Sequence, residues 1–351
     1  MPATLCGNEE GGPSMRFGLG VPTGTEGMMY PVPYADIDQA VGLAVTAERL
    51  GFDSVWGNDH MSTQAYVREE FAEPPNFFDP WLYLANVAAR TTTLGLATCI
   101  TVLPFRHPAV LAKQAATLDH LSHGRVIMGV GIGAYREEFE SLWPGRALHR
   151  GQAAEEALQA LALLFRERRA SFAGRWVSFA DVESYPKPVQ QPLPVLSGGN
   201  SPGSKQRAAT LATGWLPACL TPDELAAGIG QIRRTAGEAG RQLPDDFDVA
   251  LQLGVAIGRT REQAVQRFRN SQLYAHLTSL SRSTLKDQGG DLESRNLVGT
   301  PEQVLEQVER YREAGATTLA GLLFAANTVK ETEDDMALFS QGVIARVGAP
   351  V

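Results

Sequence analysis

Three polar residues, Asn58, Asp59 and His60, follow a short apolar stretch at 54–56 that is typical of a buried strand. A carboxylate and an imidazole at a strand end can act as a general acid and base, and parallel α/β enzymes carry out their chemistry at such ends. The alternative is an ordinary strand-to-loop junction with a solvated Asp–His pair. Taken alone, the pair favours this second interpretation.

A second candidate site is the turn Ser197-Gly198-Gly199-Asn200, which follows a predicted strand and opens a predicted helix. Glycines expose backbone N–H groups, and the positive end of a helix attracts anions, so this turn could bind a phosphate. Lys205 and Arg207, just inside the helix, favour an anion further. A plain turn with Ser201 as the helix N-cap is the alternative, and the segment alone does not decide between them.

Two further segments are candidate cofactor contacts. Glycines at 129, 131 and 133 have G-x-G-x-G spacing, which differs from the G-x-G-x-x-G nucleotide fingerprint. We expect Gly131 and Gly133 to let the backbone approach a flat ring closely. Thr98, Cys99 and Ile100 lie at the rim of the predicted third strand. Because the sequence offers no evident base for Cys99, we expect a buried, unreactive thiol.

The elements that must position these residues alternate regularly along the chain. Strand-like and helix-like stretches succeed one another from residue 15 to residue 347, with eight strands and at least eight helices. Such alternation indicates parallel strands joined by crossover helices. We therefore predict an α/β fold of the (β/α)8 TIM-barrel class with insertions. An open, doubly wound sheet is the alternative.

Several segments depart from this alternation. A Gly-, Pro- and Glu-rich tail at 1–14 is expected to be disordered, and a single domain is expected over 15–351. A small hairpin is expected near 170–180 and a mobile, polar insertion near 281–298. Residues 62–78 are predicted to be a long loop, and residues 261–280 a single helix.

Composition excludes several classes of function. The net charge of −8 argues against binding to nucleic acid or to an anionic membrane. No apolar run approaches the roughly 18 residues of a membrane span. The three cysteines are too scattered for a disulfide framework or a zinc site. This cysteine usage is typical of a cytoplasmic protein. The histidines at 107, 120, 123, 149 and 276 lack metal-ligand spacing. We predict that these histidines are structural or lie at the surface, and that no metal binds.

Taken together, many short segments resemble the luciferase-like family of flavin- and deazaflavin-dependent oxidoreductases. The resemblance runs from about Met15 to at least Pro217, and more loosely to the C-terminus. Its strength lies in the number and order of the segments, since each alone is weak. They are residues 50–56, 58–60, 94–100, 103–108, 111–114, 118–125, 129–133, 187–190, 198–202 and 214–217.

The resemblance implies a (β/α)8 barrel with a flavin or deazaflavin ring at the carboxyl ends of its strands. It also implies a cis peptide bond between Cys99 and Ile100, against the ring, and a cofactor phosphate near Gly198 and Gly199. The residues expected to contact the cofactor are Asp59, Thr98, Cys99, Ile100, Gly131, Gly133, Ser197, Gly198, Gly199 and Asn200.

An Asp–His pair after the second strand resembles the members that use coenzyme F420. The resemblance therefore favours F420, with hydride transfer to or from a small organic substrate, His60 as the catalytic residue and Asp59 as its support. Reduced FMN in an oxygen-activating monooxygenase is the alternative, and a barrel that only binds a ligand is a second one. The family also implies a homodimer.

The substrate side is less defined. Sugar-phosphate dehydrogenases of the family carry carboxylates where this chain has Pro22-Thr23 and Ala134-Tyr135, which puts a sugar-phosphate substrate in doubt. Tyr30, Arg68 and Trp81 are predicted substrate contacts.

Overall fold

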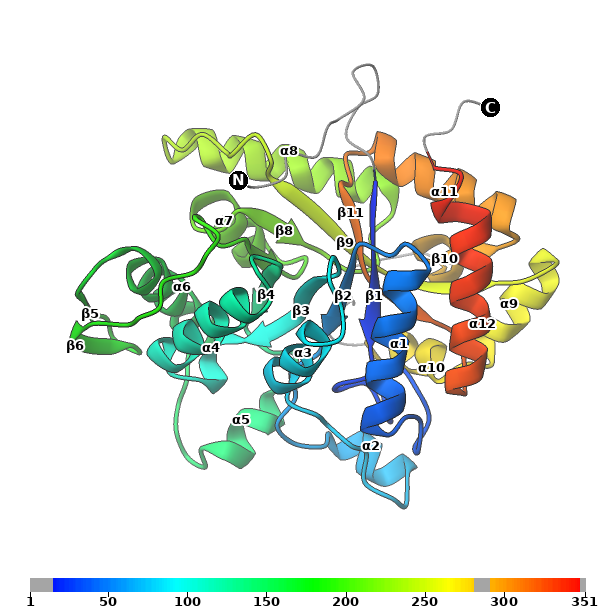
Figure 1. Ribbon diagram of the computed structural model, residues 1–351, viewed down its shortest axis with the longest axis horizontal. Coiled ribbons are helices and arrows are strands. Elements are labelled where there is room, and N and C mark those ends of the chain that lie inside the picture. The colour runs from blue at the N-terminus through cyan, green and yellow to red at the C-terminus, as the bar shows by residue number, and fades with distance from the viewer. Residues whose placement is uncertain (1–14, 281–290, 348–351) are drawn as a thin grey trace.

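A closed barrel of eight parallel strands forms the centre of the computed structural model, which describes residues 15–280 and 291–347 (Figure 1). The strands follow one another around the barrel in chain order, and β9 pairs with both β8 and β11, which closes the ring. The predicted TIM barrel is thereby confirmed. The barrel strands are β1 (Arg16–Val21), β2 (Ser54–Gly57), β3 (Gly95–Val102), β4 (Val126–Gly131), β7 (Val195–Gly198), β8 (Gly214–Leu216), β9 (Asp248–Ile257) and β11 (Thr318–Phe324).

The strands are apolar on both faces because the barrel has packed side chains inside and helices outside. Every residue of β2 and of β11 is buried. One cluster fills the interior around Trp56, whose indole Nε1 donates to Ser54 Oγ over 2.8 Å. A larger cluster joins the outward-facing strand side chains to the helices. The barrel is thus a rigid support for the loops at its carboxyl ends.

Helices surround the barrel and account for its crossover connections (Figure 1). Among the described residues, five of them begin with proline at the first position, preceded by a capping side chain. The helices around the barrel are α1 (Ile37–Arg49), α3 (Pro80–Ala88), α4 (Pro108–Leu121), α6 (Arg150–Arg166), α7 (Pro202–Thr210), α8 (Pro222–Glu238), α9 (Arg261–Arg269), α11 (Pro301–Glu313) and α12 (Val329–Phe339).

Short helices lie beyond the carboxyl ends of the strands, in segments for which we predicted a loop or no element at all. Helix α2 (Ala65–Glu70) interrupts the predicted loop at 62–78, and α5 (Arg136–Leu142), like α6, was not anticipated. Figure 1 shows α2 and α5 together at the bottom of the view, below the strand tips. The single helix predicted at 261–280 is also wrong: it divides into α9 and α10 (Gln272–Leu280) at Ser271, whose hydroxyl donates to the carbonyl of Phe268 and accepts from the N–H of Tyr274.

Smaller elements complete the chain. Strands β5 (Ala170–Ala173) and β6 (Ser178–Val182) form a separate antiparallel pair, and β10 (Leu297–Gly299) pairs with β9. Helix α12 continues into one π turn, Ser340–Ile344, while 3-10 turns occupy Leu103–Phe105 and Leu292–Arg295. The predicted tail at 1–14 and the first part of the predicted insertion, 281–290, lie outside the described residues.

Candidate functional site

Asp59 follows strand β2 and turns its carboxylate into the fold. The Arg106 guanidinium donates to both carboxylate oxygens over 2.5 and 3.0 Å, and the N–H of Val102 donates to Oδ2 over 2.9 Å. The side chain of Asp59 is only 1% exposed. Arg106 also pairs with Asp79, at the start of α3. Asp59 therefore ties the end of β2 to the end of β3 through a buried, charge-assisted network.

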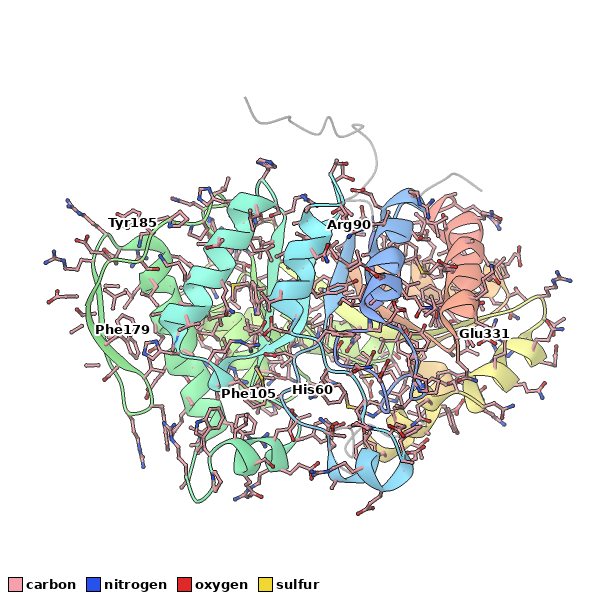
Figure 2. All side chains as sticks on the ribbon, turned by 60° about the horizontal axis from the view of Figure 1, so that its bottom comes forward. His60, Arg90, Phe105, Phe179, Tyr185 and Glu331 are labelled. Carbon is pink, nitrogen blue, oxygen red and sulfur yellow. The ribbon has the colours of Figure 1, made fainter. Side chains whose placement is uncertain are left out.

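His60, the next residue, has different partners. Its Nδ1 lies 3.1 Å from Oε2 of Glu138, a residue of α5, and 3.2 Å from Nε2 of Gln64. The expectation that Asp59 supports His60 is therefore wrong, because both oxygens of Asp59 bond to Arg106. Figure 2 shows His60 between the segments of α2 and α5, on the side of the barrel where the strands end. Its side chain is 12% exposed.

Glu138 joins α5 to the segment that follows β2. Besides contacting His60, its Oε1 accepts the backbone N–H of Met61 over 3.0 Å, and its side chain is 2% exposed. A buried carboxylate that faces an imidazole nitrogen orients the ring and stabilises the protonated Nδ1. The sequence analysis missed Glu138 because it did not anticipate α5. The Glu137-Glu138 pair beside Phe139, just after the strand-four glycines, was the available signal.

Aromatic rings and a second imidazole surround this pair. The His60 ring centre lies 5.5 Å from that of Phe77 and 5.8 Å from that of Tyr135. The Tyr66 hydroxyl lies 3.0 Å from Nδ1 of His276 and 3.4 Å from the Tyr135 hydroxyl. His276, predicted to be structural or at the surface, is buried on α10, and this burial together with the charge of His60 lowers its pKa to about 4.

The peptide bond between Cys99 and Ile100 is cis, as predicted. Ile100 packs over two glycines of neighbouring strands: a Cβ on Gly131 would lie 2.2 Å from its Cδ1, and a Cβ on Gly198 would lie 2.7 Å from its Cγ2. At Gly131, the space that we expected to accommodate a flat ring is thus filled by Ile100. Gly133 has a positive φ of 78°, and its Cβ would meet Phe139.

Thr98 and Cys99 have structural contacts. The Thr98 hydroxyl donates to the carbonyl of Gly129 over 2.8 Å, which joins β3 to β4. Cys99 is buried, as predicted, and this burial raises the pKa of its thiol to about 12.

The turn after β7 uses its polar side chains to hold its own backbone. Asn200 bonds to both the N–H and the carbonyl of Ala218, and the Ser197 hydroxyl donates to the carbonyl of Ser204. Gly199 has a φ of 105°, a conformation that side chains disfavour. The polar side chains of Ser197 and Asn200 therefore shape the turn. The N–H groups of Gly199 and Ser204 are bonded within the protein.

Arg207 points back toward that helix start. Its Nη1 lies 3.5 Å from where a Cβ on Gly203 would stand, in the first turn of α7. Arg207 is 7% exposed, and no described residue forms a hydrogen bond or ion pair with its guanidinium. Burial lowers its pKa below the usual range. The charge of Glu155 partly opposes this effect on the pKa, but Glu155 forms no ion pair with Arg207. A buried guanidinium without a hydrogen-bonded anion beside the first turn of a helix fits a phosphate group.

Two of the predicted substrate contacts, Tyr30 and Trp81, are packed inside the protein. Tyr30 is 1% exposed and stacks on Tyr34 with ring centres 4.1 Å apart, and Trp81 is buried in the main core. Arg68 lies exposed in the last turn of α2, and its role stays a prediction.

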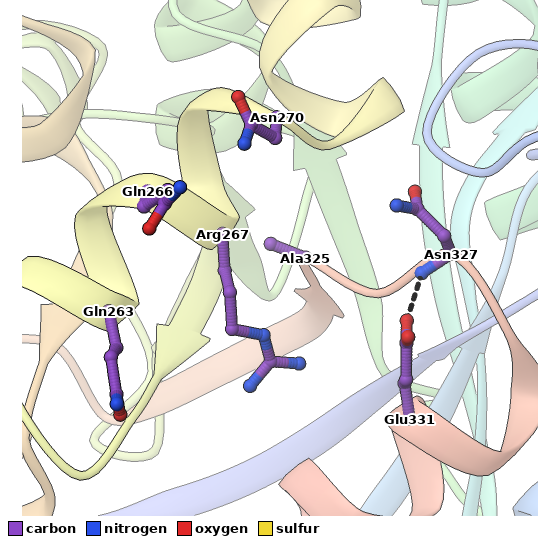
Figure 3. Close-up of a pocket in the computed structure, with 7 residues that line it drawn as sticks. All are labelled: Gln263, Gln266, Arg267, Asn270, Ala325, Asn327 and Glu331. Carbon is purple, nitrogen blue, oxygen red and sulfur yellow. Dashed lines mark hydrogen bonds between the residues drawn. The ribbon is translucent and has the colours of Figure 1, made fainter.

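Two cavities lie away from His60. Figure 3 shows a polar one of about 310 Å³ between α9 and the start of α12. Its Arg267 already binds Asp335, and Glu331 accepts the N–H of Asn327 there, so the cavity has no free cation for an anionic ligand. The other, of about 390 Å³, is an apolar groove between α6 and residues 188–195.

Metal and membrane sites are also absent from the described part of the chain. No cluster of three or more His, Cys, Asp or Glu residues there could hold a metal ion, and no helix there has the length and apolar character to cross a membrane.

The sequence of this chain matches a known protein family. Residues 15–318 match the family described as luciferase-like monooxygenase. The chain belongs to this luciferase-like family. Among its relatives, an uncharacterized protein of Mycobacterium tuberculosis is 34% identical over 237 residues, which cover 60% of this chain and 82% of the relative. An F420-dependent glucose-6-phosphate dehydrogenase of Microbacterium testaceum is 29% identical, over 79% of this chain and 85% of the relative.

Solved structures of other luciferase-like proteins share the fold. An F420-dependent secondary alcohol dehydrogenase superimposes with a TM-score of 0.75 at 20% identity, over 95% of this chain and 99% of the other. The FMN-bound oxygenating constituent of 3,6-diketocamphane monooxygenase from Pseudomonas putida has a TM-score of 0.73 at 20% identity, over 96% and 100%. This chain is thus a luciferase-like oxidoreductase whose relatives use F420 or FMN.

Proposed function

We propose that this luciferase-like oxidoreductase transfers a hydride between coenzyme F420 and a small organic substrate, with His60 as the acid–base group. The observation that carries this proposal is the buried His60–Glu138 pair at the carboxyl ends of the strands. Two relatives named F420-dependent glucose-6-phosphate dehydrogenases support the choice of cofactor. Reduced FMN with oxygen activation is the alternative, supported by the FMN-bound structural relative.

The residues of the chain have separate tasks in this proposal. Glu138 accepts the Nδ1–H of His60, so Nε2 is the atom that takes a proton from substrate or returns it. Arg207 and the first turn of α7 would hold the cofactor phosphate, with Gly198 and Gly199 shaping the turn. Ile100, which follows the cis peptide bond, would pack against one face of the ring. The bound deazaflavin would supply the redox chemistry itself.

The first test is a fluorescence-quench titration of the purified protein with F420 and, separately, with FMN. We expect F420 to bind more tightly. Binding of FMN alone would contradict the F420 assignment, and binding of neither would favour a barrel that only binds another ligand. The homodimer and the cytoplasmic location stay predictions.

The second test concerns Glu138. Glu138→Gln removes the charge that orients His60, and we expect turnover with a reactive alcohol or ketone to fall about 10- to 100-fold, with F420 affinity within about threefold. Glu140→Gln is the matched control, because Glu140 is an exposed residue of the same helix that pairs with Arg136. Equal turnover in the two variants would show that Glu138 does not position the base.

A further inference from the structure

The second imidazole, His276, is built into the same region as His60 from a distant part of the chain. Helix α10 brings it against α2, where its ring stacks on that of Tyr66 with centres 6.5 Å apart. Ring contacts then run from Tyr66 to Tyr135 at 6.2 Å and from Tyr135 to His60 at 5.8 Å. The charge of His60 contributes to the environment of His276. The two imidazoles therefore flank one aromatic cluster.

The hydrogen bonds of His276 use only one of its nitrogens. Nδ1 lies 3.0 Å from the Tyr66 hydroxyl, whereas Nε2 has no partner among the described residues. His276 is 4% exposed, yet Nε2 is not one of the buried polar atoms that the protein seals from solvent without a partner. A ring nitrogen that has no protein partner and is not sealed from solvent is open to a ligand or to water.

The direction of the bonds decides what Nε2 can do. The Tyr66 hydroxyl carries one hydrogen, and its shorter contact is to His276 Nδ1, while Tyr135 can donate to the Tyr66 oxygen. Nδ1 is then the acceptor, and Nε2 carries the ring hydrogen. A hydrogen on Nδ1 of His60 would face Glu138 and leave Nε2 as the acceptor, which is the opposite arrangement. One imidazole offers an acceptor and the other a donor.

We propose that His276 is a second substrate-binding residue, whose Nε2–H holds the oxygen of a neutral hydroxyl or carbonyl compound while His60 exchanges the proton of that oxygen. This inference rests on the proposed function. In the alcohol direction, the carbon-bound hydrogen would leave as a hydride to the bound deazaflavin, while the O–H bond breaks and its proton moves to Nε2 of His60. The carbonyl oxygen that forms accepts from His276. The substrate class is neutral because the donor is an uncharged imidazole and because Arg106 is already paired with Asp59 and Asp79.

Two near-isosteric variants test this role. Glutamine places its side-chain amide near the position of Nε2, whereas asparagine places it near Nδ1. His276→Gln therefore keeps a donor for the substrate, and His276→Asn keeps only the contact with Tyr66. The protein is first saturated with F420, and the affinity for cyclohexanone is then measured by calorimetry. We expect His276→Asn to weaken cyclohexanone binding about tenfold and His276→Gln to weaken it by less than threefold.

A purely structural histidine predicts the opposite order, because the Tyr66 contact then matters most. Equal affinities, or weaker binding in His276→Gln than in His276→Asn, would overturn the proposal. His107→Ala, at the cap of α4, is the control and should bind like the wild type. Imidazole ¹⁵N NMR gives an independent readout, with Nδ1–H expected for His60 and Nε2–H for His276; the same tautomer at both would also overturn it. Failure of F420 itself to bind would instead contradict the proposed function.

Discussion

The turn after β2 and the turn after β7 have similar positions at the carboxyl ends of barrel strands, yet they use their polar residues differently. After β2, the carboxylate of Asp59 binds Arg106 and stabilises the fold. Its neighbour His60 uses Nδ1 to contact Glu138, which leaves Nε2 for a substrate. After β7, Ser197 and Asn200 both bond to the protein. The first turn thus offers a side chain for chemistry. The second offers backbone N–H groups, joined by Arg207 from one turn further along α7.

This difference follows from what each turn would bind. A proton must be exchanged by an atom with a tunable pKa, which only a side chain supplies. A phosphate needs several donors in a fixed concave arrangement, which a backbone held rigid by its own side chains provides. Changes at the two turns should therefore affect different measurements.

Removal of His60 should have the largest effect. For His60→Ala we expect turnover to fall about 100- to 10,000-fold, because proton transfer loses its base, while F420 affinity stays within a few fold. Steady-state kinetics and quench titration on the same preparation measure the two quantities. Persistent turnover would show that the turn after β2 does not supply the acid–base group.

Loss of the Asp59 charge should affect stability next most. Asp59→Asn leaves Arg106 facing a neutral amide in a buried position, and we expect the free energy of unfolding to fall by about 3 kcal/mol in urea titrations. Asp79→Asn is the matched control, since Asp79 is 33% exposed, asparagine also caps a helix, and Arg106 keeps Asp59. A larger loss in the control would mean that Asp79 is the main partner.

At the turn after β7, we expect Arg207→Gln to weaken F420 binding about 10- to 100-fold, because a charge-assisted bond to phosphate is lost. The deazaflavin riboside that lacks the phosphate should bind the wild type and this variant alike. Lys205→Gln, on the same helix, should change F420 affinity by less than threefold. A loss of affinity for the riboside as well would place Arg207 away from the phosphate.

The smallest expected effect concerns pH and the surroundings of His60. Burial lowers the pKa of His276 to about 4 from an ordinary value of 6.5, so the folded protein holds this group neutral while the unfolded chain protonates it. Its contribution to stability is complete above pH 6.5 and is lost as the pH falls toward 4.

Between pH 7 and pH 5 this residue alone should reduce the free energy of unfolding by about 2 kcal/mol. Urea unfolding of the wild type and of His276→Gln at both pH values isolates that contribution, because the other titrating groups are common to both proteins. A difference between the two proteins that does not change with pH would mean that His276 titrates normally.

Sequence reasoning reached the barrel because alternation of strands and helices is a local pattern with few solutions. It reached the cis bond at Cys99–Ile100 through family resemblance. It misjudged Gly131, since a glycine signals missing volume but not its occupant, here Ile100. It missed Glu138 because the short helix α5 was not anticipated. It did not place His276 near His60 because the partner of His276, Tyr66, is 210 positions away in the chain.

The sequence by itself determined the fold class, the family and the two turns where polar residues gather, because each depends on neighbours along the chain. Only the tertiary structure decided which partner each polar group has. Asp59 and His60 are adjacent in sequence, yet their partners are 47 and 78 positions away. Strand order and loop packing bring those partners in, so the role of the Asp–His pair follows from the closed barrel and not from the spacing of its two residues.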